Sequence, residues 1–104
     1  MAPDAYRDMI LQNAVPLATI RQDITVYLGD QFSKIREDHN VIAPREIHLA
    51  NDWPGHRTLQ ELVDMAVPLF IVAATVCRFV RDPNWDPQEQ LEKIQELRRV
   101  GDLE

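Results

Sequence analysis

The longest apolar run of the chain, residues 65 to 80, would present apolar side chains on every face of a helix. A helix of that composition must be covered on all sides. The run has Pro68 near its start, and Cys77 and Arg78 near its end. Three further helical segments can be identified, and they are barely enough to surround it. We therefore expect part of its surface to pack against another polypeptide.

A second helix is predicted to begin at Thr19, a candidate N-cap residue. Apolar residues then recur at spacings of three and four, which predicts one buried helical face. These residues are Ile20, Ile24, Tyr27, Leu28, Phe32 and Ile35. Gly29 costs such a helix about 1 kcal/mol relative to alanine. It either permits a partner helix to cross closely or is simply tolerated.

The periodicity stops between His39 and Gly55. Pro44 and the Asp-Trp-Pro-Gly sequence of residues 52–55 predict a long loop that ends in a defined turn. Trp53 is expected to anchor this loop beneath the helices.

Two capping patterns mark further helix starts. Thr58 and Glu61 have the spacing of a capping box, in which the hydroxyl and the carboxylate satisfy each other's backbone amides. Asp86 and Glu89 repeat the pattern, with Pro87 in the first turn. The inward positions of these two helices are Leu59, Leu62, Val63 and Ala66 in the first, and Leu91, Ile94 and Leu97 in the second.

Pro68, Trp85 and Gly101 mark the remaining helix boundaries and turns. Pro68 either kinks a continuous helix or lies in the first turn of a new one. Trp85 follows the turn sequence Asp-Pro-Asn and is expected to close the bundle. Gly101 is expected to end the last helix.

Together these patterns predict an all-α fold, a small four-helix bundle with an extended N-terminal connector and one long loop. The 104 residues, 45% of them hydrophobic, fit a single globular domain. We assign residues 1–17 to the connector, 18–101 to the bundle and 102–104 to a tail, a possible vector remnant. An alternative for the connector is a short helix that ends before Pro16, because a residue that precedes proline favours extended geometry.

The composition narrows the class of partner. The net charge of −6, with basic residues scattered among acidic ones, disfavours nucleic acid as a partner. The apolar run is shorter than the roughly 20 residues of a membrane span and contains Arg78, so no membrane association is expected. No leader-type segment opens the sequence, which favours a cytoplasmic protein. Cys77, the single cysteine, is expected to be a small buried hydrophobe.

The sequence lacks the patterns of a catalytic site. None of the three glycines precedes a Lys-Ser or Lys-Thr pair as in a P-loop. His39, His48 and His56 share a region with Glu46 and Asp52, but their spacings match no standard zinc pattern. A cysteine–histidine nucleophile pair is not indicated either. We therefore expect this chain by itself to be no enzyme and to hold no metal or cofactor.

A longer pattern resembles a known family. It consists of Asp23-Ile24, Tyr27-Leu28, Ile35, Asp52-Trp53-Pro54, Leu62 and the continuous run from Ala66 to Val80, and it covers most of the chain. The pattern is similar to the helical region that follows the nucleotide-binding core in fungal NACHT-type NTPases. These are STAND signalling ATPases, the fungal relatives of NOD-like receptors. The Trp-Pro turn and the Leu-Phe-Ile-x-Ala-Ala-Thr run are specific together.

The resemblance implies a helical lid that packs on the NTPase core, with residues 9–16 as the connector that leaves the sheet of that core. The sequence Val67-Pro68-Leu69 resembles the hydrophobic-Pro-Leu motif whose proline packs against the adenine ring in related NTPases. Pro68 would then face ATP or ADP in the parent protein, with Val67 and Leu69 beside it. Ala66 stands where the family usually has glycine, two residues before the proline.

Two functions from different classes follow. The first is a non-catalytic lid or regulatory fragment, partnered by the parent NTPase core and neighbouring domains, that couples nucleotide state to conformational change in an innate-immunity-like signalling protein. The alternative is a self-contained helical protein–protein interaction module that forms homo-oligomers and has no nucleotide role. Under either function we expect a homodimer in isolation, because an apolar surface without its natural cover can be hidden by pairing two copies.

Overall fold

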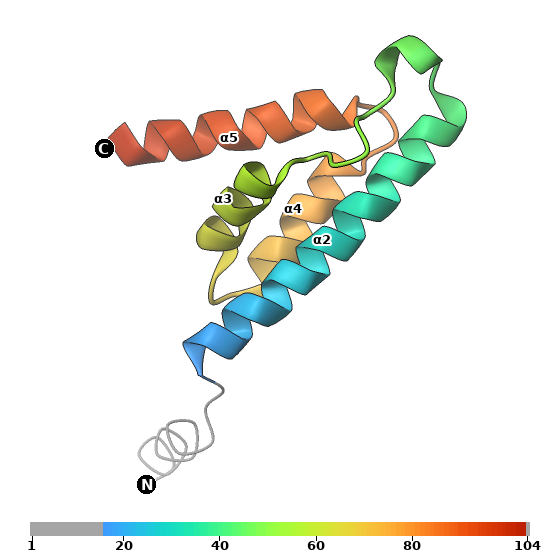
Figure 1. Cartoon of the computed structure of the whole chain (residues 1–104). Coiled ribbons are helices and arrows are strands. Elements are labelled where there is room, and N and C mark those ends of the chain that lie inside the picture. Colours follow the sequence, from blue (N-terminus) through green and yellow to red (C-terminus); the bar gives the residue numbers. More distant parts are fainter. Residues whose placement is uncertain (1–15, 104) are drawn as a thin grey trace, which may run out of the picture.

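The computed structural model describes residues 16–103, and the expected connector before Pro16 lies outside this range. Within it the chain forms four α-helices, one 3₁₀ turn and no strand (Figure 1). The elements are α2 (Leu17–Ile42), η1 (Arg45–Ile47), α3 (His56–Ala66), α4 (Phe70–Val80) and α5 (Pro87–Leu103). The predicted all-α, four-helix fold is confirmed.

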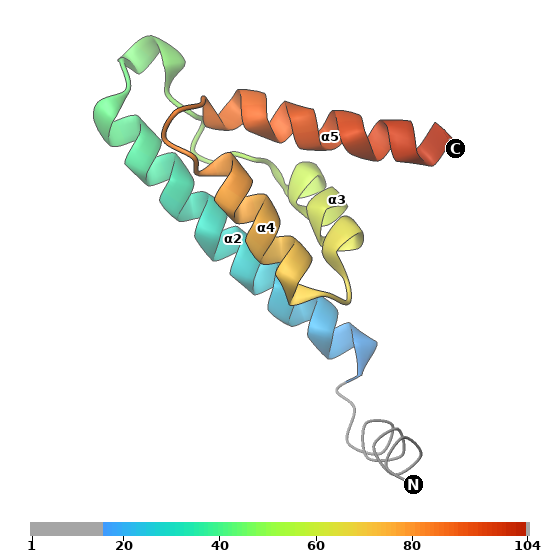
Figure 2. The ribbon, with the colours of Figure 1, turned by 180° about the vertical axis from the view of Figure 1, so that it is seen from behind.

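Helix α2 is the longest element, and α3 and α4 pack against the same side of it (Figure 1). Helix α5 packs on α4 and runs across the bundle from the end where α4 finishes (Figure 2). The C-terminal end of α2 and η1 extend past the other helices (Figure 1). We call this projection, residues 39–50, the arm.

The core lies where the faces of the four helices meet. The predicted stripe of α2 supplies its centre, because Ile24, Leu28 and Phe32 are fully buried. The other buried apolar residues of the described range are Ile35, Trp53, Leu62, Val63, Ala66, Ala73, Val76, Cys77, Val80, Pro87, Leu91 and Ile94. Helical spacing in the sequence therefore identified the buried centre of α2 and the buried positions Leu62, Val63 and Ala66 of α3 and Leu91 and Ile94 of α5.

Trp53 anchors the long loop, as the turn sequence predicted. Its side chain is 8% exposed, and its ring centroid lies 5.4 Å from that of Phe32. Its indole Nε1 donates a hydrogen bond to Oε1 of Gln88 at 2.7 Å. Its carbonyl accepts one from Nη1 of Arg36 at 3.2 Å. One side chain thus joins the loop to both α2 and α5.

Helix α2 begins and ends elsewhere than predicted. Pro16 occupies the N-cap position, and its carbonyl accepts the amides of Thr19 and Ile20 at 2.9 and 3.1 Å. Thr19 is therefore inside the first turn, and its assignment as N-cap is wrong. Proline suits this position because the first amides of a helix have no intrahelical partner. At the other end α2 continues three residues past His39, to Ile42.

Helix α3 also begins earlier than the capping box indicated. Gly55 precedes it with a φ of 92°, a conformation that favours glycine, and its carbonyl accepts the Leu59 amide at 2.9 Å. The helix therefore starts at His56, and Thr58 makes no capping hydrogen bond from its side chain. The glycine turn sets the start of this helix, and the Thr58–Glu61 prediction is wrong.

The start of α5 matches its prediction, and two other expectations for this region are wrong. Oδ2 of Asp86 accepts the Glu89 amide at 3.1 Å, which is the predicted N-cap bond. Helix α5 runs through Gly101 to Leu103, because one glycine costs a helix only about 1 kcal/mol. Trp85 is 53% exposed, and Nζ of Lys93 lies 4.5 Å from its ring centroid, so this tryptophan does not close the bundle.

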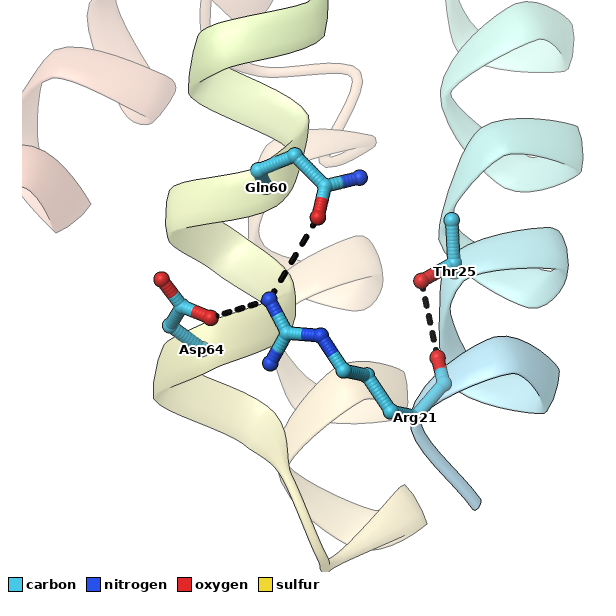
Figure 3. Close-up of polar contacts among 4 residues, drawn as sticks. All are labelled: Arg21, Thr25, Gln60 and Asp64. Atoms are coloured by element: carbon cyan, nitrogen blue, oxygen red, sulfur yellow. Dashed lines mark hydrogen bonds and ion pairs between the residues drawn. The ribbon is translucent and has the colours of Figure 1, made fainter. Parts of the chain in front are cut away.

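Helix α3 crosses α2 beside Gly29 without close contact. A Cβ built at Gly29 would lie 3.9 Å from Cδ2 of Leu59, an ordinary van der Waals distance. Gly29 is therefore tolerated and is not needed for the crossing. About two turns before Gly29 on α2, Arg21 joins the two helices through its ion pair with Asp64 and a 3.4 Å hydrogen bond to Gln60 (Figure 3). Both partners of that ion pair are substantially exposed, so it contributes about 1 kcal/mol or less to stability.

Candidate functional site: the turn between α3 and α4 and its apolar surroundings

The turn between α3 and α4 contains the three predicted site residues. Val67 ends α3 with extended geometry, ψ 133°, as expected of a residue before proline. Pro68 neither kinks a continuous helix nor enters the first turn of α4, which begins at Phe70. The amide of Leu69 donates to the carbonyl of Ala66 at 2.7 Å, and this bond closes the turn. Two separate helices therefore meet at Pro68.

The end of the bundle at this turn is apolar and open to solvent. Pro68 is exposed, and the exposed fractions of Leu69, Phe70 and Ile71 are 55%, 44% and 68%. Val67 is half-buried and packs against the core. The structure thus places the three predicted site residues together, with two of them accessible. Their contact with adenine stays a prediction.

The turn is fastened to α2 through an aromatic pair. The rings of Tyr27 and Phe70 meet edge to face, with centroids 5.9 Å apart and planes at 74°. Such a pair contributes about 0.5 to 1.5 kcal/mol beyond its buried area. Because Phe70 is the first residue of α4, this contact fixes the start of α4, and with it the turn, relative to α2.

A second apolar feature continues from the turn along α4. It is a groove of about 400 Å³ between α3, α4 and α5. We call it the α3–α4–α5 groove; its lining residues are Met65, Ile71, Val72, Thr75, Val76, Phe79, Ile94 and Leu97. Leu97 was expected to face inward, and this expectation is wrong, because it is 72% exposed while Ile94, one turn earlier, is buried. The core thus covers α5 as far as Ile94, and Leu97 lies on the rim of the groove.

A larger hollow, of about 550 Å³, lies between the second half of α2 and the turn that joins α4 to α5. Its walls carry charges of both signs, with Lys34 and Asp38 on α2 and Arg81 and Asp82 after α4. Arg81 donates a hydrogen bond to Gln31 across the hollow. This mixture places no single charge sign at its centre and indicates no particular ligand.

Cys77 is a buried small hydrophobe, as predicted. It is 1% exposed, and burial raises its pKa to about 11, an effect that the positive charge of Arg81 partly opposes. Because the thiolate is the reactive form of cysteine, a thiol with this pKa is a poor nucleophile at neutral pH.

The loop histidines hold the arm together. Nε2 of His39 donates to the carbonyl of Ile47 at 3.0 Å, and Nε2 of His48 donates to that of Ala43 at 2.9 Å. Asn40 adds a pair of bonds, from its Nδ2 to the Leu49 carbonyl at 3.0 Å and from the Leu49 amide to its Oδ1 at 2.8 Å. Residues 16–103 contain no group of three or more histidine, cysteine or acidic side chains placed to hold a metal ion.

The arm was missed by the sequence reasoning, which assigned residues from His39 onward to a loop. Its contacts join residues five to nine positions apart, which no hydrophobic periodicity marks. The residues that carried some signal were Asn40 and the two histidines, because such side chains often pair with the backbone of an irregular segment.

Comparisons of the chain with protein-family models, with curated proteins and with solved structures found no match. Among the described helices, none is long and apolar enough to cross a membrane.

Proposed function

We propose that this chain is a non-catalytic helical lid of a NACHT-type signalling ATPase and couples the nucleotide state of its parent protein to conformational change. The observation that carries the proposal is the open apolar end of the bundle, where Pro68, Leu69, Phe70 and Ile71 follow one another and are all exposed. A lid needs such an end, because it must pack on the NTPase core beside the bound nucleotide. Pro68 lies at the first position of this run, where its ring is accessible to an adenine supplied by the core.

The contacts of the turn indicate how a nucleotide at Pro68 would move the lid. Val67 packs into the core on one side of the proline, and Phe70 is held by Tyr27 on the other. When an adenine binds at Pro68 or leaves it, the whole bundle therefore moves as one rigid body, as in hinge motions of domains around a ligand. ATP or ADP would be held chiefly by the phosphate and magnesium ligands of the core, and this chain would supply the apolar contact to the base.

A direct test uses the parent polypeptide with its NTPase core. Pro68→Gly removes the ring that would contact adenine, and Pro44→Gly, at another exposed proline, is the matched control. An apolar platform beneath a base contributes about 1 to 3 kcal/mol, so we expect ATP and ADP to bind about fivefold or more weakly to the Pro68 variant by calorimetry. The control should bind as the unaltered protein does. Unchanged affinity in a folded Pro68 variant would refute the nucleotide role.

The α3–α4–α5 groove favours a second candidate, a self-contained helical module that binds another protein and has no nucleotide role. Its lining is almost wholly apolar, and Ile71 and Leu97 on its rim are 68% and 72% exposed. Exposed apolar surface of this kind marks protein interaction sites. The two candidates differ in the Pro68→Gly experiment, because the second predicts no effect on nucleotide affinity.

A further inference from the structure

The arm carries three largely exposed aliphatic side chains, of which Ile42 also lines the hollow between α2 and the turn from α4 to α5. Val41 and Ile42, at the end of α2, are 81% and 85% exposed, and Ile47 of η1 is 53% exposed. The hydrogen bonds of His39 and His48 hold η1 against the end of α2, so Ile47 lies on the same projecting part of the chain as Val41 and Ile42. We call Val41, Ile42 and Ile47 the arm tip.

The arm tip and the α3–α4–α5 groove are both apolar. The tip is a projection of aliphatic side chains, and the groove is a hollow of about 400 Å³ with an almost wholly apolar lining. The arm extends away from the other helices (Figure 1), so the tip does not reach the groove of its own chain. A groove of the same chemistry is available on a second copy.

The charges beside the two surfaces are complementary. Around the tip, residues 37–48 contain three acidic side chains, Glu37, Asp38 and Glu46, and one basic side chain, Arg45. Beside the groove, Arg78 adjoins Phe79, and Arg98 and Arg99 follow Leu97. These three bases outnumber Glu61 and Glu96, their acidic neighbours in ion pairs with Arg98 and Arg99. Opposite net charges steer two such surfaces together.

We propose that the arm tip of one copy of this chain docks in the α3–α4–α5 groove of a second copy. The two surfaces are different, so the contact is heterologous, and a bound pair still has one free tip on one copy and one free groove on the other. Repetition of such a contact gives open chains, or a ring where the rotation closes. This open-ended arrangement is an alternative to the homodimer that the sequence predicted, and it is independent of any nucleotide role.

Two single variants and their mixture test the contact. Ile42→Lys alters the tip, and Leu97→Lys alters the groove; both side chains are more than 70% exposed, so neither change removes core packing. Val26→Lys, at a 56% exposed position on α2 outside both surfaces, is the matched control. Circular dichroism establishes that each variant is folded, and light scattering over a concentration series gives the mass of each.

The unaltered chain and the Val26 control should grow with concentration beyond the 12.0 kDa of one copy and should not stop at a dimer. Each of the other two variants should remain monomeric. Their equimolar mixture should form a one-to-one dimer, because the Ile42 variant retains a groove and the Leu97 variant retains a tip.

Three results would overturn the proposal. A chain that stays monomeric at every concentration has no such contact. An Ile42→Lys variant that still associates, while Leu97→Lys does not, indicates a symmetric contact between two grooves. A mixture that stays monomeric shows that the tip and the groove do not bind each other.

Discussion

The side chain of Gln90, in the first turn of α5, caps the end of α4 through the backbone carbonyl of Phe79. Gln90 is 2% exposed, and its Nε2 donates to that carbonyl at 3.2 Å. The carbonyl belongs to the last turn of α4, where no amide of the same helix is available. Oε1 of Gln90 is the one buried side-chain oxygen or nitrogen of the described residues without a hydrogen-bond partner. The side-chain amide of Gln90 thus joins the start of α5 to the end of α4.

Gln90→Glu should lower the free energy of unfolding at neutral pH. The introduced carboxylate would face the Phe79 carbonyl without a proton to donate, which costs about 1 to 3 kcal/mol or more. Burial raises the pKa of such a carboxyl in the folded chain above its value in the unfolded chain. At a pH below the unfolded-state value the carboxyl is protonated and can donate to the Phe79 carbonyl, so the stability is retained. The stability is lost as the pH rises through the folded-state value. Urea unfolding at acidic and neutral pH measures this difference.

Gln90→Met is the matched control for that experiment. It lacks a titratable group, so its loss of stability should not depend on pH relative to the unaltered chain. Equal pH profiles for the two variants would contradict the hydrogen bond to Phe79.

Trp53→Phe should destabilise the fold. The indole bond to Gln88 is lost and the ring that packs on Phe32 is smaller, which together lower the free energy of unfolding by about 1 to 3 kcal/mol. Trp85→Phe, at a 53% exposed side chain, should change it by about 0.5 kcal/mol or less. Chemical denaturation of both variants gives the comparison, and similar losses would contradict the role of Trp53 as the anchor.

The same two tryptophans show how far the sequence predicts this fold. Trp53 lies within a turn sequence and Trp85 directly follows one, and both were expected to pack against the helices. Trp53 is buried because Phe32 and Gln88 lie where its ring and its indole nitrogen can meet them. Trp85 remains outside, while Pro87, two residues later, is buried in its place. Local sequence identifies the turns, and only the packing of distant elements decides which side chain of a turn enters the core.

The sequence predicts the turn at Pro68 and the presence of a groove on α4, but it does not predict the contribution of Leu97 or the arm. The exposed turn at Pro68 follows from the restricted backbone of proline and of the residue before it. A groove on α4 follows from an apolar run with too few helices to cover it. The contribution of Leu97 could not be predicted, because a helical stripe does not reveal how far along α5 the other helices extend. The arm depends on hydrogen bonds from the side chains of His39 and Asn40 to backbone carbonyls, and these residues carry no periodic signal.

Cys77 should be inert to thiol reagents at neutral pH and should destabilise the fold at high pH. Burial raises its pKa from the ordinary value of 9.0 to about 11, so its contribution to stability is complete below about 9 and is lost as pH rises toward 11. The free energy of unfolding should fall by on the order of 1 kcal/mol per pH unit in that window. Thermal unfolding from pH 8 to 11, compared with Cys77→Ala, isolates this contribution from that of other titrating groups.

Two glycine substitutions should have opposite effects on stability. Gly29→Ala should raise the free energy of unfolding by up to about 1 kcal/mol, because alanine favours helix and the new methyl group would lie 3.9 Å from Leu59. Gly55→Ala should lower it by about 1 to 3 kcal/mol, although nothing lies within 4 Å of the added Cβ. The cost comes from the backbone, whose φ of 92° is rarely adopted by residues with a side chain.

This pair separates steric space from backbone conformation, since Gly55 has more room than Gly29 and should nevertheless tolerate alanine less. It also tests why α3 begins at His56. If Gly55 sets that start, the Gly55 variant should lose helix content in α3 along with stability, which amide hydrogen exchange of residues 56–66 would detect. A Gly55 variant as stable as the Gly29 variant, with unchanged exchange in α3, would instead mean that the turn can adopt another backbone at little cost and that packing of Leu62 and Val63 sets the position of the helix.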